Sequence, residues 1–217
     1  MSTLGTPDGH ARESPPVAGR GGSMPMKHDS GAVLAHIEGL TVTQGQGVGE
    51  KIELLPWERR FLRGVLRTDG DAALTLARGN GKTTLAAALA HAALDGPLVQ
   101  PRAEVVASSF GQARIDFEHV LGFLSADGPL NRRRWRVQDS AQSASIEDRE
   151  TGARVGCIAS DPRRAHGLAP LIVIADEPAQ WPANTSERML AALRTSMGKI
   201  PGSRLIALGT RSENPEH

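Results

Sequence analysis

Residues 77–84 read ARGNGKTT, and this stretch decides the fold. Gly81-Lys82-Thr83 matches the end of the phosphate-binding pattern G-x-x-x-x-G-K-[ST], although Leu76 stands where that pattern has its first glycine. The short apolar run 73–77 favours a strand, and the alanine- and leucine-rich residues 81–94 favour a helix. Backbone N–H groups at such a strand-to-helix turn bind anions. For the tripeptide alone, an ordinary glycine turn with a surface lysine is an equal alternative.

A nucleotide bound at this loop would place its phosphates against six residues. They are Gly79, Asn80, Gly81, Lys82, Thr83 and Thr84. Lys82 would reach the β- and γ-phosphates, and the hydroxyl of Thr83 would ligate Mg²⁺. ATP and Mg²⁺ are therefore the expected ligands.

Two further apolar runs end in polar residues. IVIADE (172–177) ends in Asp176 and Glu177, and LIALGT (205–210) ends in Gly209 and Thr210. Asp176 is expected to hold Mg²⁺ through its waters, and Glu177 to polarise the attacking water. Gly209 and Thr210 are expected to sense the γ-phosphate and couple it to the rest of the domain. The plain alternative for both runs is a strand that exits into a polar loop or turn.

Along the chain, predicted strands alternate with predicted helices. Besides the segments above, it predicts helices over 54–66, 111–124 and 186–198, strands over 103–109, 170–177 and 203–210, and short strands between 135 and 160. This alternation predicts a three-layer α/β fold with a mostly parallel central sheet. With the glycine loop it indicates a P-loop NTPase of the additional-strand, RecA-like type.

Composition sets limits on the class of protein. The 25 Lys and Arg residues nearly balance the 24 Asp and Glu residues, so net charge gives no nucleic-acid footprint. The single cysteine excludes an internal disulfide framework and favours a reducing compartment. We find no membrane-spanning run and no signal-peptide pattern, and so expect a soluble cytoplasmic protein.

The first thirty or so residues are rich in Gly, Pro and Ser. They show no apolar periodicity, so residues 1–32 are predicted to be a disordered tail, with a partner-binding arm as the alternative, and residues 33–217 the ATPase domain. NRRRWR (131–136) could touch DNA phosphates with Trp135 packing beneath, but a solvated loop is the favoured interpretation.

Four stretches together resemble the ATPase domain of the large terminase subunit, the motor that packages DNA into tailed-phage proheads. They are GVGEKIELLPWERRFL (47–62), ARGNGKTT (77–84), ASSFGQARIDF (107–117) and RRAHGLAPLIVIADE (163–177). The resemblance implies that Trp57 and Glu58 form an adenine motif, in which Glu58 stands in for the family's glutamine. It also implies that Arg78, four residues before the lysine, marks this family's variant of the loop and stabilises charge during hydrolysis.

The same resemblance implies the partners. They are double-stranded DNA, a portal protein, a small terminase subunit and further copies of the chain in a ring on the prohead, with no membrane. Arg163 and Arg164 are candidates for an arginine finger toward a neighbouring subunit, although His166 departs from the family at the position nearest Gly167. A solvated loop without such a role is an equal alternative for the two arginines.

Large terminases usually carry a nuclease domain after the ATPase. Here no carboxylate cluster follows the ATPase core, so no nuclease activity is expected, and the chain is expected to be a fragment, a split gene with the nuclease on a separate chain, or a prophage remnant. The alternatives are a nucleotide-binding module without turnover and another nucleic-acid-dependent ATPase such as a helicase.

Overall fold

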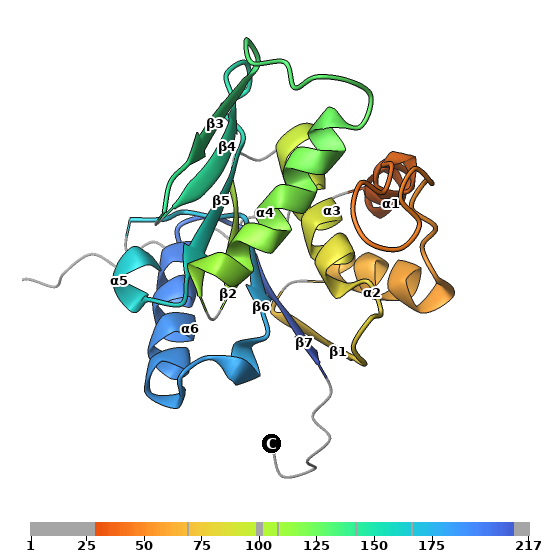
Figure 1. Cartoon of the computed structure of the whole chain (residues 1–217). Coiled ribbons are helices and arrows are strands. Elements are labelled where there is room, and N and C mark those ends of the chain that lie inside the picture. Colours follow the sequence, from red (N-terminus) through yellow and green to blue (C-terminus); the bar gives the residue numbers. More distant parts are fainter. Residues whose placement is uncertain are drawn as a thin grey trace, which may run out of the picture.

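The computed structural model describes residues 29–68, 70–98, 102–107, 109–141, 143–165 and 167–210 (Figure 1). The elements follow one another as α1 (Ser30–Gly39), α2 (Pro56–Arg67), β1 (Ala72–Leu76), α3 (Lys82–Asp95), β2 (Arg102–Ala107), α4 (Phe110–Ser125), β3 (Trp135–Asp139), β4 (Ala144–Asp148), β5 (Arg154–Ala159), α5 (Pro162–Ala165), β6 (Ile172–Asp176), the 3-10 turn η1 (Pro178–Gln180), α6 (Ala183–Met197) and β7 (Arg204–Thr210).

One seven-stranded sheet forms the middle layer, in the order β1-β7-β6-β2-β5-β4-β3. The pairs from β1 through β5 are parallel, and β4 and β3 extend the sheet as antiparallel strands. β7 lies between β1, which leads into the glycine loop, and β6, which ends in the two carboxylates. This insertion confirms the additional-strand fold and its mostly parallel sheet.

Apolar side chains on both faces of the sheet create the three layers. On β2, Val105 faces the cluster built with α1, α2, α3 and α4, whereas Val106 faces the cluster built with α5 and α6. Successive residues of a strand point to opposite faces, so a continuous apolar run is needed where both faces are covered. β6 is such a run, since all five of its residues are buried.

Helix α3 is buried almost all round. Ten consecutive residues, 85–94, are buried, and most of them are alanine or leucine. The small alanine side chains let the sheet, α1 and α4 approach α3 from different sides. The helix that begins at the glycine loop is therefore rigidly fixed to the core.

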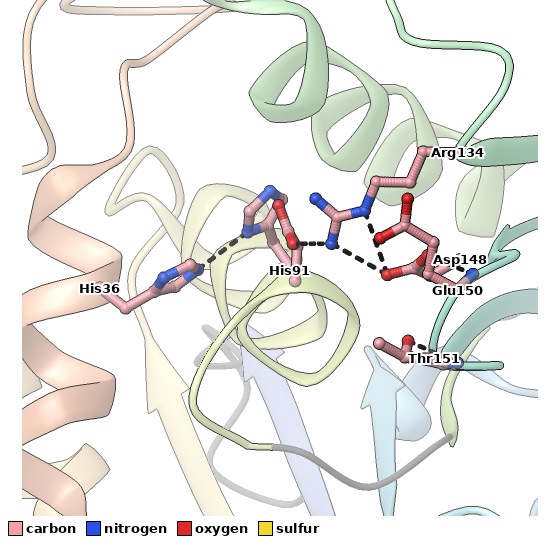
Figure 2. A network of polar contacts seen from close by, with 8 residues as sticks. His36, His91, Arg134, Asp148, Glu150 and Thr151 are labelled. Carbon is pink, nitrogen blue, oxygen red and sulfur yellow. Dashed lines mark hydrogen bonds and ion pairs between the residues drawn. The ribbon is translucent and has the colours of Figure 1, made fainter.

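A polar network joins the C-terminal end of α3 to its neighbours (Figure 2). His36 of α1 and His91 of α3 share a hydrogen bond of 3.0 Å between Nε2 and Nδ1. Arg134 pairs with Asp95, the last residue of α3, and donates from its Nη2 to Asp148 of β4 at 2.9 Å. α1, α3 and the antiparallel strands are thus tied together.

The structure refines several expectations. The run between 135 and 160 resolves into β3, β4 and β5, and the other predicted elements are present with ends shifted by a few residues. α1 was not predicted: its first turn takes up residues 30–32, which the sequence assigned to the tail, and residues 1–28 lie outside the described residues. Trp135 of the basic run is 5% exposed and stacks under Arg134 at 4.3 Å, so these two residues serve the fold.

None of the helices in the described part of the chain is long and apolar enough to cross a bilayer.

Candidate nucleotide site

Three strands deliver the predicted site residues to one edge of the sheet. Leu76 at the end of β1 is the register partner of Thr210 at the end of β7, and Asp176 at the end of β6 is the partner of Leu208. Because β1, β7 and β6 are parallel neighbours, their carboxyl ends meet there, which is where open α/β sheets bind ligands. The glycine loop leaves the sheet at the same edge.

The loop's backbone explains the missing first glycine. Leu76 is the last paired residue of β1, in extended backbone that any side chain can adopt. The left-handed conformations fall at Gly79 (φ 78°) and at Gly81 (φ 70°), which is the N-cap of α3. Asn80 donates from Nδ2 to the carbonyl of Ala77 at 3.1 Å and closes the turn.

Lys82, Glu177 and Thr210 converge although they are far apart in sequence. The Lys82 ammonium pairs with Oε1 of Glu177 and also contacts the hydroxyl of Thr210. The backbone N–H of Thr210 donates to Oε2 of Glu177 at 2.7 Å, and its hydroxyl donates to Oε1. Burial acts to raise the pKa of Glu177, but the bonds from Lys82 and Thr210 outweigh it and hold the pKa below its ordinary value. Glu177 is therefore ionised at neutral pH.

Glu177 has an unusual backbone. Among the described residues, Glu177 is the one non-glycine residue with a positive φ, at 48°. This conformation costs a residue that carries a side chain about 1 kcal/mol or more. Its N–H donates to the carbonyl of Leu208 at 2.7 Å, and Nε1 of the buried Trp181 donates to the carbonyl of Asp176 at 3.0 Å. These bonds fix the turn that separates the two carboxylates. Gly209 lies beside it, since a Cβ there would be 3.9 Å from Oε2 of Glu177.

Asp176 lies deeper than Glu177, at 4% exposure. Burial, and next the charge of Glu177, raises the pKa of Asp176, whereas Lys82 and a hydrogen bond from Gln112 oppose that rise. Gln112 is in the first turn of α4, and one turn further Asp116 is 1% exposed with both carboxyl oxygens lacking a hydrogen-bond partner. Burial, followed by the charge of Asp176, raises the pKa of Asp116 well above its ordinary value.

Sequence reasoning did not single out Gln112, Asp116 or Trp181. Their contacts with the carboxylate turn depend on how α4 and η1 pack, which no local pattern reveals. The available signal was only that Gln112 and Asp116 lie one helical turn apart on a predicted helix.

The donor set fits a Mg²⁺ ion held mostly by a nucleotide and water. Within the described residues, no three His, Cys, Asp or Glu side chains converge to form a metal cage. Mg²⁺ commonly takes one or two protein oxygens and completes its shell with phosphates and waters. Thr83, in the first turn of α3, lines the cavity beside the loop, and Asp176 ends β6 at the same edge of the sheet.

A cavity of about 670 Å³ lies beside the loop. Gly79, Asn80, Gly81, Lys82, Thr83 and Thr84 all line it. Glu58 also lines it, from α2, and accepts a hydrogen bond of 2.7 Å from the N–H of Leu55. Burial raises the pKa of Glu58, although that bond opposes the rise. Trp57 is not among the lining residues, and Arg78 is exposed beside the loop without a hydrogen bond or ion pair in the described part of the chain.

Comparison with known proteins supports the sequence resemblance. The large terminase subunit of Enterobacteria phage HK97 is 24% identical over 188 residues. The crystal structure of the HK97 large terminase superposes with a TM-score of 0.69 at 25% identity and covers 86% of this chain. The chain is similar to large terminase subunits. The terminase ATPase domain of Thermus phage P74-26 shares the fold, with a TM-score of 0.52, 19% identity, and coverage of 76% of this chain and 68% of that domain's chain.

This terminase-like chain spans little more than a third of its relatives' length. The sequence match takes in 84% of this chain and 36% of the HK97 subunit. The structural match takes in 39% of the chain in the HK97 crystal structure. No protein-family profile matches it.

The two candidate finger residues lie at the carboxyl edge, beyond the end of β5. Arg163 is 90% exposed and pairs with Asp161 at 3.1 Å, and Arg164 is the next residue of the short helix α5. One strand, β2, lies in the sheet between β5, which leads into them, and β6, which carries the carboxylates. The ion pair of Arg163 is thus with Asp161 and not with the cluster around Lys82. His166 lies outside the described residues.

Proposed function

We propose that this chain is the ATPase motor domain of a phage terminase large subunit, coupling ATP hydrolysis to packaging of double-stranded DNA into proheads. The observation that carries the proposal is the convergence of Lys82, Glu177 and Thr210 at the mouth of the glycine loop. A lysine on a phosphate loop, an ionised glutamate and a hydroxyl at the tip of the inserted strand are the groups that ATP hydrolysis needs.

Nucleotide binding would use the loop and the adjoining cavity. The N–H groups at the start of α3 face the phosphates, and Lys82 supplies a positive charge to the β- and γ-phosphates. The base would occupy the 670 Å³ cavity near Glu58. Mg²⁺, held through Thr83 and Asp176, would neutralise charge on the phosphates.

Hydrolysis would use the same cluster after a change of partners. Lys82 leaves Glu177 for the phosphates, and the freed carboxylate accepts a proton from the attacking water. Arg78 stabilises charge that develops on the γ-phosphate. Thr210, bonded to Glu177 through its N–H, reports the state of the phosphate to β7.

The wider assembly is part of the proposal. The HK97 relative is a phage terminase large subunit, so the proposed partners are double-stranded DNA, a portal protein, a small terminase subunit and a ring of copies. The proposed location is the host cytoplasm. This ATPase domain itself is proposed to lack nuclease activity.

Phosphate release from ATP tests the proposal, measured with and without linear double-stranded DNA and a small terminase subunit. The wild-type chain should release phosphate, faster with DNA, and Lys82→Ala should lower the rate by about a hundredfold or more because a fixed charge at the phosphates is lost. Arg188→Ala, an exposed arginine on α6, is the matched control.

Unchanged turnover in Lys82→Ala would remove the loop from the mechanism. ATP binding without any phosphate release would instead favour a nucleotide-binding module. DNA strand separation driven by ATP would favour a helicase.

A further inference from the structure

Among the described residues, no helix covers one half of one face of the sheet. Helices α5 and α6 pack over β6, β7 and β2 through an apolar cluster that includes Val106, Val173 and Met189. The same face continues across β5, β4 and β3, where its side chains are mostly polar. Arg136 and Glu147 on it are 51% and 41% exposed.

Two rows of residues cross this uncovered face, each residue being the register partner of the next. The row nearer the start of β2 is Arg102, Arg154, Glu147 and Arg136, and the row above it is Glu104, Gly156, Ser145 and Gln138. Arg102 and Arg154 are direct neighbours on adjacent strands. Like charges in that position repel, so their pairing needs a negative group to offset it.

A buried carboxylate supplies part of that charge. Glu104 is 1% exposed, and its Oε1 lies 3.8 Å from Nε of Arg102 without a hydrogen-bond partner. The space it fills exists because residue 156 is glycine: a Cβ there would collide with the carboxylate of Glu104. One buried carboxylate therefore lies against two guanidinium groups. Glu147, the register partner of Arg154, adds a second negative charge and pairs with Arg136 at 3.9 Å, so the three arginines and two glutamates of the two rows keep one surplus positive charge.

A cavity of about 480 Å³ lies beside these residues. Arg102, Arg154, Glu147 and Gln138 line it, together with Gly152. Arg102 and Arg154 begin their strands, so the cavity lies at the edge of the sheet opposite the one that carries Lys82 and Glu177. It is separate from the proposed ATP site.

We propose that this cavity binds a small tetrahedral oxyanion, of the phosphate or phosphomonoester class, between the guanidinium groups of Arg102 and Arg154. Guanidinium groups recognise such oxyanions through paired N–H donors, and the amide of Gln138 adds another donor. The concave shape favours a compact anion over the convex backbone of a nucleic-acid duplex. The site goes beyond the proposed motor function and does not depend on it.

Glu104 makes the affinity of this site depend on pH. The charged groups facing Glu104 are Arg102 on its own strand and Arg154 on β5, and its register partner on β6 is the apolar Val173. Burial raises the pKa of Glu104 to about 7, against the opposing charges of Arg154 and Arg102. Protonation of Glu104 removes a negative charge beside the anion, so binding tightens as pH falls through 7.

Titration of the chain with sulfate, followed by backbone amide NMR, tests the proposal. Sulfate keeps its charge across this pH range, so the protein alone sets any pH dependence. The amide of Gly156 reports the cavity and that of Gly81 reports the glycine loop. Gly156 should shift saturably, and Arg154→Gln should weaken that binding by about tenfold or more. Arg188→Gln, which replaces an exposed arginine of α6 outside the cavity, should leave it unchanged.

The pH series uses Glu104→Gln. Sulfate should bind the wild type more tightly at pH 6 than at pH 8, whereas the variant should bind equally at both. Inorganic phosphate and a sugar phosphate, compared at one pH, distinguish a site for the free ion from one that also accepts a monoester. If Arg154→Gln does not fold, Arg102→Gln gives the same readout.

A response at Gly81 but none at Gly156 would overturn the site. Equal affinity in Arg154→Gln and Arg188→Gln would do the same.

Discussion

At the scale of single residues, the charged and polar side chains of the site bond to one another. Lys82 and Glu177 neutralise each other, and Thr210 holds Glu177 by two bonds. In the proposed mechanism ATP competes with Glu177 for Lys82, so ATP binding and the release of this carboxylate are one event. Glu177 also sits in strained backbone, a state that persists only where its surroundings fix it.

Arg78 is free to act on the transition state. It is exposed and unengaged within the described residues, so no ground-state partner holds it in place. Arg78→Ala should lower the single-turnover rate by about tenfold or more while ATP affinity changes by less than about threefold. Arg188→Ala is the control. Weaker ATP binding with a normal rate at saturation would assign Arg78 to ground-state binding.

At the scale of elements, the motif-bearing strands and helices were predictable and their neighbours were less so. β6 and β7 are recognisable in the sequence as apolar runs that end in polar residues. α3 is recognisable as an alanine-rich segment that follows a glycine. α1 was overlooked because it directly follows a glycine- and proline-rich stretch. Its signals were present: Asp29 caps it by accepting from the N–H groups of Gly31 and Ala32, and Val33, Leu34 and Ile37 form a buried stripe.

The docking of α1 on α3 makes stability depend on pH. Burial, followed by the nearby His36 and Arg134, lowers the pKa of His91 to about 3 (Figure 2). The unfolded chain takes up this proton near the ordinary value of about 6.5. The stability from neutral His91 is therefore fully present above that pH and is lost below it, by about 1.4 kcal/mol per pH unit.

His91→Gln removes this term while leaving the other titrating groups in place. Denaturant unfolding of both proteins at pH 7, 6 and 5 checks it: the stability advantage of the wild type should shrink toward pH 5. An advantage that stays constant across this range would show that His91 does not titrate as the structure implies.

At the scale of the whole molecule, the sequence predicted which motifs act together, but not how they contact one another. Lys82, Glu177 and Thr210 were each singled out from patterns, because strands of an additional-strand sheet end at a common edge. Their mutual bonds, the support from Gln112 and Trp181, and the polar face bearing Arg102 and Arg154 arise from tertiary packing. No short sequence window contains that information.

The proposed ring motor should hydrolyse ATP slowly as an isolated chain, because its finger arginine would come from a neighbouring copy. Turnover per chain should therefore rise with protein concentration, and Arg163→Ala or Arg164→Ala should abolish the rise. Mixing the deficient arginine variant with Glu177→Gln should restore part of it, since each supplies what the other lacks. Vigorous hydrolysis by a demonstrated monomer would argue against a finger supplied in trans.

The central claim is that Glu177 activates water and Asp176 serves the metal, and paired binding and single-turnover measurements test it directly. ATP affinity, titrated with and without Mg²⁺, and the hydrolysis rate are measured for Glu177→Gln and Asp176→Asn. Glu177→Gln should bind ATP at least as tightly as the wild type, because Lys82 loses its competing partner, and hydrolyse it about a hundredfold more slowly or worse. Asp176→Asn should lose the Mg²⁺-dependent part of binding. Loss of binding in Glu177→Gln with retention in Asp176→Asn, or normal turnover in both, would contradict the account.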